Sequence, residues 1–309
     1  MLRRKNKKTA SLLVFALAYI LWGIDTVYIK IVVDNMPVAL FSFLRFSIAA
    51  LALLPFVLKH YKKMNPRVWA RLTISSLIGM SLFFLVLGEG LKRTTALNSA
   101  LIFLLGPIWM YVLSIEVLKE KFNAKILLGL IVAFSGTVLV VGAPLLLGDH
   151  SLHNGSFIGN MIIFVAVFIG VLGTVMVKPV LKKAPPTQIT TIRFAIVALS
   201  MLPLLFYQKP DLSTITVTPT LAFAVFYTII IGTILAYVLY HWSLGKISGE
   251  ESSTLQYLDP LLGVLASIII LGNQLTPIVL LGGALTVLGV FLSEARAKKH
   301  TFPHLRPHR

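Results

Sequence analysis

The stretch RFSIAALALLP, residues 45–55, returns as RFAIVALSMLP, residues 193–203, which begins 148 residues later. Each copy joins an arginine and a phenylalanine to an apolar run that ends in proline. Lys30 recurs at Lys178 with the same offset. Self-similarity at a fixed distance predicts a fold that is built from two related halves.

The repeat continues further along the chain with a slightly larger offset. Three more residues return 153 residues later, namely Pro107, Gly129 and Gly136 at Pro260, Gly282 and Gly289. The five extra residues fall between the second and fourth apolar segments of the second half, where 208–219 forms a longer loop. We therefore expect the halves to have the same number of helices.

Composition identifies the solvent of this fold. Hydrophobic residues make up 57% of the 309 positions and charged residues only 13%, whereas a soluble domain carries about 25% charged residues. A span of roughly 20 apolar residues crosses the hydrocarbon core of a bilayer. The chain is thus predicted to be an all-α integral membrane protein with ten transmembrane helices near 10–33, 37–58, 70–88, 95–117, 125–147, 157–181, 187–207, 219–244, 252–272 and 276–295.

The basic residues predict the orientation. If the ten segments alternate in direction and the N-terminus is cytoplasmic, 22 of the 28 Lys and Arg residues fall on the cytoplasmic side and three on the other. Positive charge gathers on the cytoplasmic side of membrane proteins. We expect a multi-pass protein of the plasma (inner) membrane with both termini in the cytoplasm. We therefore expect the basic residues behind the net charge of +17 to interact with anionic lipid and not with nucleic acid.

Three units follow from the repeat: 1–148 as a first five-helix repeat with a basic N-terminal tail, 149–296 as a second repeat, and 297–309 as a basic cytoplasmic tail. Five is an odd number, so the second repeat enters the membrane in the opposite orientation. Inverted repeats are a known device for alternating access around a site near the bilayer midplane.

With these features the chain resembles the EamA family of the drug/metabolite transporter superfamily. The resemblance covers roughly 12–143 and 157–294. It rests on the order and spacing of short motifs, which are Trp22-Gly23, Arg45-Phe46, Pro107, Glu120, Arg193-Phe194 and Tyr257-Leu258-Asp259-Pro260. The sequence departs from the family at one motif. Where the family usually has Gly-Glu, this chain has Lys119-Glu120 in one half and Gly272-Asn273 in the other. The resemblance implies ten helices, a central cavity, and export or exchange of amino acids, nucleosides, drugs or similar solutes.

Four ionisable residues lie well inside the predicted spans. A charge at the bilayer centre costs about 2.5–3.5 kcal/mol, so these groups need partners or water. Estimated depths match Asp25 with Arg45 and Asp259 with Arg193. Each pair is either a static packing contact or a pair that switches during transport. Proton coupling through either aspartate is a further possibility, since burial favours the protonated carboxyl group.

Aromatic and amide side chains near mid-depth form the candidate solute site, because stacking surfaces and a few hydrogen bonds suit an amphipathic solute. With the two acids, the predicted substrate-binding residues are Trp22, Asp25, Tyr28, Asn98, Trp109, Tyr237, Tyr240, Gln256, Tyr257 and Asp259.

The sequence therefore favours a secondary transporter, an exporter or exchanger of a small metabolite such as an amino acid or an amphipathic drug-like solute. The alternatives are a passive channel or a membrane scaffold, and less favoured is an intramembrane enzyme, for which the sequence shows no catalytic motif. With no cysteine, we expect neither a metal site nor a cofactor.

Overall fold

A computed structural model describes residues 2–106, 108–110, 112–113, 128–129, 131–132, 134–136, 138–139, 153–244, 246, 255–256, 258–272 and 276–297. Its regular elements are helices, in agreement with the predicted all-α class. In the first half they are α1 (Leu2–Asn35), α2 (Val38–Lys59), α3 (Pro66–Ser76), the π-helical η1 (Leu77–Leu82), α4 (Phe83–Arg93) and α5 (Ala96–Phe103).

The second half begins with α8 (His153–Val177), the short η2 (Val180–Lys182) and α9 (Pro186–Gln208), which is followed by η3 (Leu212–Thr214). It continues with α10 (Pro219–Phe226), the π-helical η4 (Tyr227–Leu235), α11 (Ala236–Leu244), α13 (Leu258–Leu271) and α14 (Pro277–Ala297).

Six helical stretches of the described residues are long and apolar enough to cross a membrane: Thr9–Asn35, Val38–Lys59, Pro66–Arg93, Phe157–Lys182, Pro186–Gln208 and Pro219–Leu244. Shorter apolar helices lie within the predicted segments 95–117, 252–272 and 276–295. The predicted segment 125–147 lies largely outside the described residues. The chain is thus a multi-pass membrane protein.

The two π-helical segments sit at repeat-related places. Pro66 and Pro219 each open a helix, and 153 residues separate them. Asn65 and Thr218 cap these helices by accepting hydrogen bonds from the Val68 and Leu221 amides at 2.9 and 3.1 Å. Each helix then passes through a π segment near its middle, at η1 and η4. The local sequence thus produces the same broken helix twice.

Helix contacts obey the same relation between halves. Helix α1 packs against α11 and α13, and its repeat-related partner α8 packs against α4 and α5. Helix α2 packs against its own counterpart α9, and α5 against α13. At the α2–α9 contact the fully buried rings of Phe46 and Phe194 lie 5.5 Å apart. Exchanging the two halves therefore leaves the set of helix pairs that pack together nearly unchanged.

Glycines bring two of these contacts very close. A Cβ on Gly79 of η1 would overlap the backbone of Gly173 in α8, and a Cβ on Gly232 of η4 would overlap the carboxyl group of Asp25 in α1. Gly79 and Gly232 are repeat-related, as are Asp25 and Gly173. The two crossings are therefore equivalent in the repeat but differ in chemistry. The η1–α8 crossing is a contact between two glycine backbones, whereas the η4–α1 crossing places a carboxylate against a glycine.

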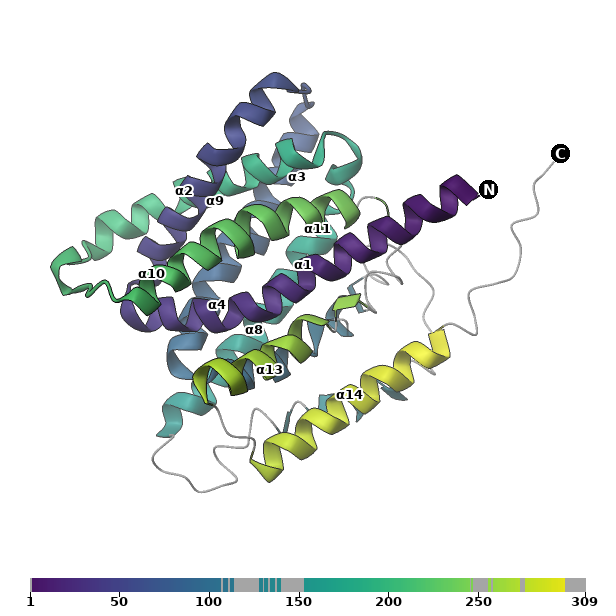
Figure 1. Ribbon diagram of the computed structural model, residues 1–309, viewed down its shortest axis with the longest axis vertical. Coiled ribbons are helices and arrows are strands. Elements are labelled where there is room, and N and C mark those ends of the chain that lie inside the picture. The colour runs from purple at the N-terminus through teal and green to yellow at the C-terminus, as the bar shows by residue number, and fades with distance from the viewer. Residues whose placement is uncertain are drawn as a thin grey trace.

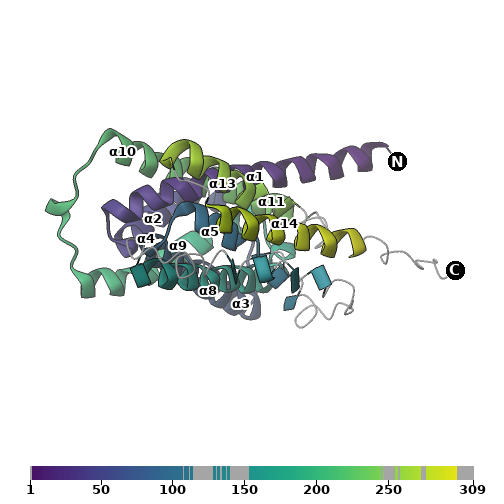
Figure 2. The same ribbon diagram turned by 90° about the horizontal axis from the view of Figure 1, so that it is seen from below.

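The helices form a bundle with two visible faces. Figure 2 shows α1 and α13 along one face and α3 and α8 along the opposite face. The first residues of α1 and the last residues of α14 lie at the same end of the molecule in both views (Figures 1 and 2).

Large apolar side chains point outward from this bundle, while charged residues lie within it. Phe206 is 76% exposed and Ile269 is 79% exposed, but Arg45 is only 1% exposed. Such a surface suits lipid and would be unfavourable in water. The polar interior is where a site can be expected.

Candidate functional site

A cavity of about 160 Å³ lies between the two halves. One water requires about 10–15 Å³ on this scale, so the cavity has room for a solute of roughly ten non-hydrogen atoms. The described lining residues are Tyr19, Trp22, Asp25, Thr26, Ile29, Arg45, Gly79, Met80, Phe83, Phe84, Leu87, Phe103, Gly106, Met110, Val167, Gly170, Val171, Thr174, Arg193, Tyr237, Tyr240, Gln256, Asp259 and Pro260.

Arg45 and Asp25 form a buried ion pair at this cavity. The Arg45 Nη2 donates to the Asp25 Oδ2 at 2.7 Å, and the two side chains are 1% and 2% exposed. Arg45 Nε donates to the hydroxyl of Thr233 in η4, and the guanidinium lies 4.9 Å from the Phe84 ring. The pair thus joins α1 and α2 of the first half to η4 of the second.

The π-helical turn at η4 makes this arrangement possible. Because Gly232 lacks a side chain, the Asp25 carboxylate can lie against its backbone. The Gly232 carbonyl, which belongs to the π-helical segment, accepts a hydrogen bond from the Trp22 Nε1 at 2.9 Å. Its neighbour Thr233 donates to the Thr228 carbonyl at 2.6 Å, which leaves its oxygen free to accept from Arg45.

Arg193 has a different partner. Among the described residues no carboxylate lies within ion-pair distance of it, and its Nη1 lies 3.2 Å from the Nε2 of His241. The His241 Nδ1 lies 2.7 Å from the Thr190 hydroxyl, which donates to the Pro186 carbonyl at 2.8 Å. Since an arginine can only donate, we assign His241 as the neutral Nδ1–H tautomer.

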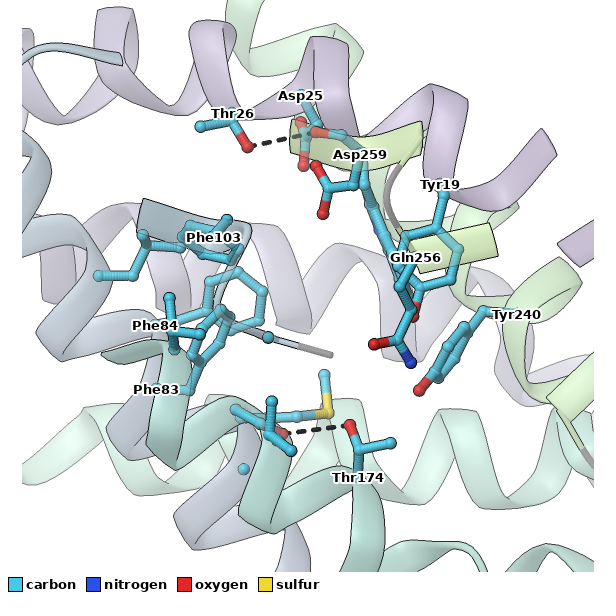
Figure 3. A pocket seen from close by; sticks show the side chains of 18 of the residues that line it. Tyr19, Asp25, Thr26, Phe83, Phe84, Phe103, Thr174, Tyr240, Gln256 and Asp259 are labelled. Carbon is cyan, nitrogen blue, oxygen red and sulfur yellow. Dashed lines mark hydrogen bonds between the residues drawn. The ribbon is translucent and has the colours of Figure 1, made fainter. Parts of the chain in front are cut away.

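Asp259 presents a carboxylate to the cavity from the first turn of α13. In the described part of the chain no lysine or arginine lies within ion-pair distance of it. A Cβ on Gly23 of α1 would come within 2.5 Å of the Asp259 carbonyl oxygen, so α1 and α13 cross closely here. Figure 3 shows the Asp259 side chain pointing into the cavity beside Asp25.

An aromatic cluster borders the acidic end. The Trp22 ring lies 4.8 Å from both Tyr237 and Tyr240 and 5.3 Å from Tyr19, measured between ring centroids. These rings come from α1 and α11, whose contact brings them together. Their hydroxyl and indole groups give the cavity both stacking surfaces and hydrogen-bonding atoms.

The predicted site residues divide into two groups in the structure. The cavity is lined by Trp22, Asp25, Tyr237, Tyr240, Gln256 and Asp259, and by both arginines. Tyr28 instead packs 4.6 Å from Tyr227, Asn98 lies 3.4 Å from Asn160, and the Trp109 ring lies 5.1 Å from Phe168. Tyr257 lies outside the described residues.

Several lining residues were not among the predicted ones. They include Tyr19 and Thr26 on α1, Thr174 on α8, and the phenylalanines Phe83, Phe84 and Phe103. The repeat could have indicated Thr174, because it lies 148 residues after Thr26 and each threonine donates to the carbonyl four residues earlier. His241 carried no sequence signal beyond its place in an apolar helix.

The described residues bring no three His, Asp or Glu side chains together closely enough to hold a metal ion. Within the part of the chain that the structure describes, the cavity offers one ion pair, one carboxylate and one arginine without counter-charges, and aromatic surfaces. These groups can bind a small solute and orient it.

Comparison with known proteins adds the family. The model of the EamA-like transporter family matches residues 9–142 and 157–294, one match in each half. An uncharacterised transporter of Archaeoglobus fulgidus is 25% identical over 94% of this chain and 99% of its own. A probable amino-acid metabolite efflux pump of Salmonella typhimurium is 25% identical over 90% of this chain and 92% of its own.

A second probable amino-acid metabolite efflux pump, from Escherichia coli, is 23% identical over 90% of this chain and 92% of its own. A solved crystal structure superimposes with a TM-score of 0.68 at 15% identity, and the match covers 94% of this chain and 99% of that one. This structural similarity concerns the fold alone.

Proposed function

Because the chain belongs to the EamA-like transporter family, we propose that it is a secondary transporter that exports or exchanges a small metabolite. The solute is an amino acid or an amphipathic drug-like molecule, and it binds in the cavity between the halves. The observation that carries the proposal is this cavity, which both halves line and which holds charged residues that would be costly in a lipid-embedded bundle.

In the proposed architecture ten helices form two inverted five-helix repeats, 1–148 and 149–296, followed by the basic tail 297–309. The repeat-related helix contacts support it, and so does the common end at which α1 begins and α14 finishes, because an even number of crossings returns the chain to its starting side. The clusters of Lys and Arg support a plasma-membrane location, cytoplasmic termini and contacts with anionic lipid.

Alternating access would follow from the near-symmetry of the contacts. If the two halves exchange conformations, the α1–η4 crossing and the η1–α8 crossing exchange their spacing. The Asp25–Arg45 pair spans the first of these crossings through Thr233, so it forms when that crossing is closed and loosens when it opens. Asp25 and Arg45 therefore act as a switching contact in this proposal.

Proton coupling belongs to the same proposal and is assigned to Asp259. This carboxylate faces the cavity without an ion-pair partner in the described residues, so it can take up a proton or a positively charged solute, one at a time. Charged and titratable groups around the same cavity are Asp25, Arg45, Arg193, Tyr19, Tyr237 and Tyr240.

Reconstituted protein tests the proposed function. Liposomes that contain the purified protein are preloaded with unlabelled amino acids and amines, one compound at a time. Uptake of the corresponding labelled compound is then measured with and without a pH gradient. Accumulation above the equilibrium level supports a secondary transporter. Flux that only equilibrates the compound indicates a channel, and no flux of any compound indicates a scaffold.

A matched pair of variants connects this transport to the cavity. Asp259→Asn removes the cavity carboxylate, whereas Glu89→Gln removes an exposed carboxylate of α4 that pairs with Lys92 and Arg93. We expect the first variant to lose the effect of the pH gradient and the second to keep it. An effect that survives in Asp259→Asn assigns the proton to another group.

A further inference from the structure

The repeat relates the cavity-lining residues in pairs, and the members of most pairs differ in polarity. The offset is 148 residues between α1 and α8, and 153 residues between α4 and α11 and between α5 and the region of α13. Six pairs combine a residue with a polar group and a small or apolar one: Tyr19 with Val167, Trp22 with Gly170, Tyr237 with Phe84, Tyr240 with Leu87, Gln256 with Phe103, and Asp259 with Gly106.

The polar members all come from one side of the bundle. They lie on α1, on α11 and at the start of α13, and we call these residues with Asp25 the polar wall. Their counterparts lie on α8, α4 and α5, and we call these residues with Phe83 the apolar wall. Figure 3 shows Phe83, Phe84 and Phe103 on one side of the cavity and Tyr19, Gln256 and Tyr240 on the other.

Charge is distributed unevenly along the polar wall. Asp25 is neutralised by Arg45 at 2.7 Å. The Asp259 carboxylate has no such neighbour among the described residues, is partly exposed, and lines the same wall of the cavity as the Tyr19 and Trp22 rings. A carboxylate beside aromatic faces attracts an organic cation through both Coulomb and cation–π interactions.

We propose that the cavity binds small amphipathic ammonium compounds in a single orientation, with the ammonium group against Asp259 and the apolar group against Phe83, Phe84 and Phe103. The inference rests on the proposed transport function, since it names the class of solute for the same site. It goes beyond that function by assigning one wall to each end of the solute.

Two kinds of molecule carry this chemistry, an amino acid with an apolar side chain and a simple amine. Arg193 lines the cavity and has no carboxylate partner in the described residues, so it can receive the carboxylate of an amino acid. The two kinds of molecule are therefore distinguished by measuring the binding of L-leucine, 3-methylbutylamine and 4-methylpentanoate, which share one branched apolar group.

Binding is measured by isothermal titration calorimetry on the purified full-length protein in detergent. We expect L-leucine, 3-methylbutylamine or both to bind and 4-methylpentanoate to bind at least tenfold more weakly. Binding of the amine identifies the simple cation as sufficient, and binding of L-leucine alone identifies the zwitterion. Comparable binding of 4-methylpentanoate overturns the proposal.

Variants test each wall separately. Asp259→Asn is expected to weaken binding at least tenfold, Asp259→Glu to restore part of it, and Glu89→Gln to leave it unchanged. In the linear amines from propyl to hexyl, affinity is expected to rise about threefold to fourfold per methylene group, and Phe103→Ala flattens this rise. Unchanged amine binding in a folded Asp259→Asn variant, verified by its thermal unfolding curve, overturns the proposal.

The outcome is separable from the transport proposal. Binding of ammonium compounds through Asp259, combined with no flux of any compound across liposome membranes, would contradict the transport proposal and leave this inference standing. Accumulation of some other solute that Asp259→Asn does not affect would support transport and overturn the inference.

Discussion

The carboxyl group of Asp25 occupies the space that a side chain on Gly232 would need. The two residues are 207 positions apart in the sequence, and their contact fixes the distance between α1 and the π-helical η4. The same contact lets Arg45 reach both the carboxylate and Thr233. The lack of a side chain at Gly232 thus allows the contacts among Asp25, Arg45 and Thr233 to form.

Replacement of Gly232 by alanine should therefore displace Asp25. We expect Gly232→Ala to lower the free energy of unfolding by about 1–3 kcal/mol through overpacking and to abolish transport. Thermal unfolding in detergent measures the first effect. Gly106→Ala is the control for unfolding, because among the described residues a Cβ there would meet only Val167 Cγ1 at 3.9 Å. Equal unfolding temperatures for the two variants would contradict the close contact.

Removal of both charges of the Asp25–Arg45 pair should cost less than the two separate removals added together. Asp25→Asn leaves a buried arginine without a counter-charge, which costs about 3–5 kcal/mol. The double variant Asp25→Asn/Arg45→Met should be less destabilised than the sum of the single variants. Unfolding curves of all four proteins give the coupling energy.

The partly exposed pair Lys30–Asp34, at 2.8 Å, provides the comparison for this cycle. Lys30→Met should cost no more than about 1 kcal/mol, because exposed ion pairs contribute little. Additive effects at Asp25 and Arg45 would show that their buried contact does not stabilise the fold.

The chain of hydrogen bonds from Arg193 through His241 to Thr190 should be sensitive to its last member. Thr190→Val removes the acceptor for the His241 Nδ1–H and leaves a buried donor unpaired, at a cost of about 1–3 kcal/mol. Thr191→Val is the matched control, since this buried threonine also donates to the carbonyl four residues earlier, at 2.9 Å. Similar losses of stability in both variants would exclude a special role for the His241 contact.

The hydrogen bond from Trp22 to the π-helical carbonyl of Gly232 allows a comparison of two tryptophans. Trp22→Phe loses a bond of 2.9 Å, with an expected cost of about 0.5–1.5 kcal/mol beyond the loss of contact area. The Trp109 Nε1 is buried without a partner among the described residues, so Trp109→Phe should cost less. Thermal unfolding of the two variants decides, and a larger loss at Trp109 would contradict the assignment.

The sequence indicated the fold class and some of the residues that line the cavity, each for an identifiable reason. Hydrophobic length marks membrane spans without knowledge of their packing. Depth follows from the rise per residue, and this is why Asp25 and Arg45, estimated at similar depth, could be considered together. The structure brings these two into contact.

Rotation about the helix axis is what depth cannot supply. Tyr28, Asn98 and Trp109 lie at plausible depths but face other helices, because the direction of a side chain depends on which neighbours the helix packs against. The partner of Arg193 was hidden for the same reason. His241 belongs to a different helix, and only the packing of α9 on α11 brings the two together.

The pairing of Phe46 with Phe194 across α2 and α9 has a consequence of its own. Phe46 and Phe194 are related by the repeat, so exchanging the two halves leaves the contact between them unchanged. In the proposed alternating-access motion, crossings between helices that are not each other's counterparts, such as α1–η4 and η1–α8, must lengthen or shorten. The Phe46–Phe194 contact can keep its geometry throughout this motion, so it can serve as a fixed pivot between the two halves.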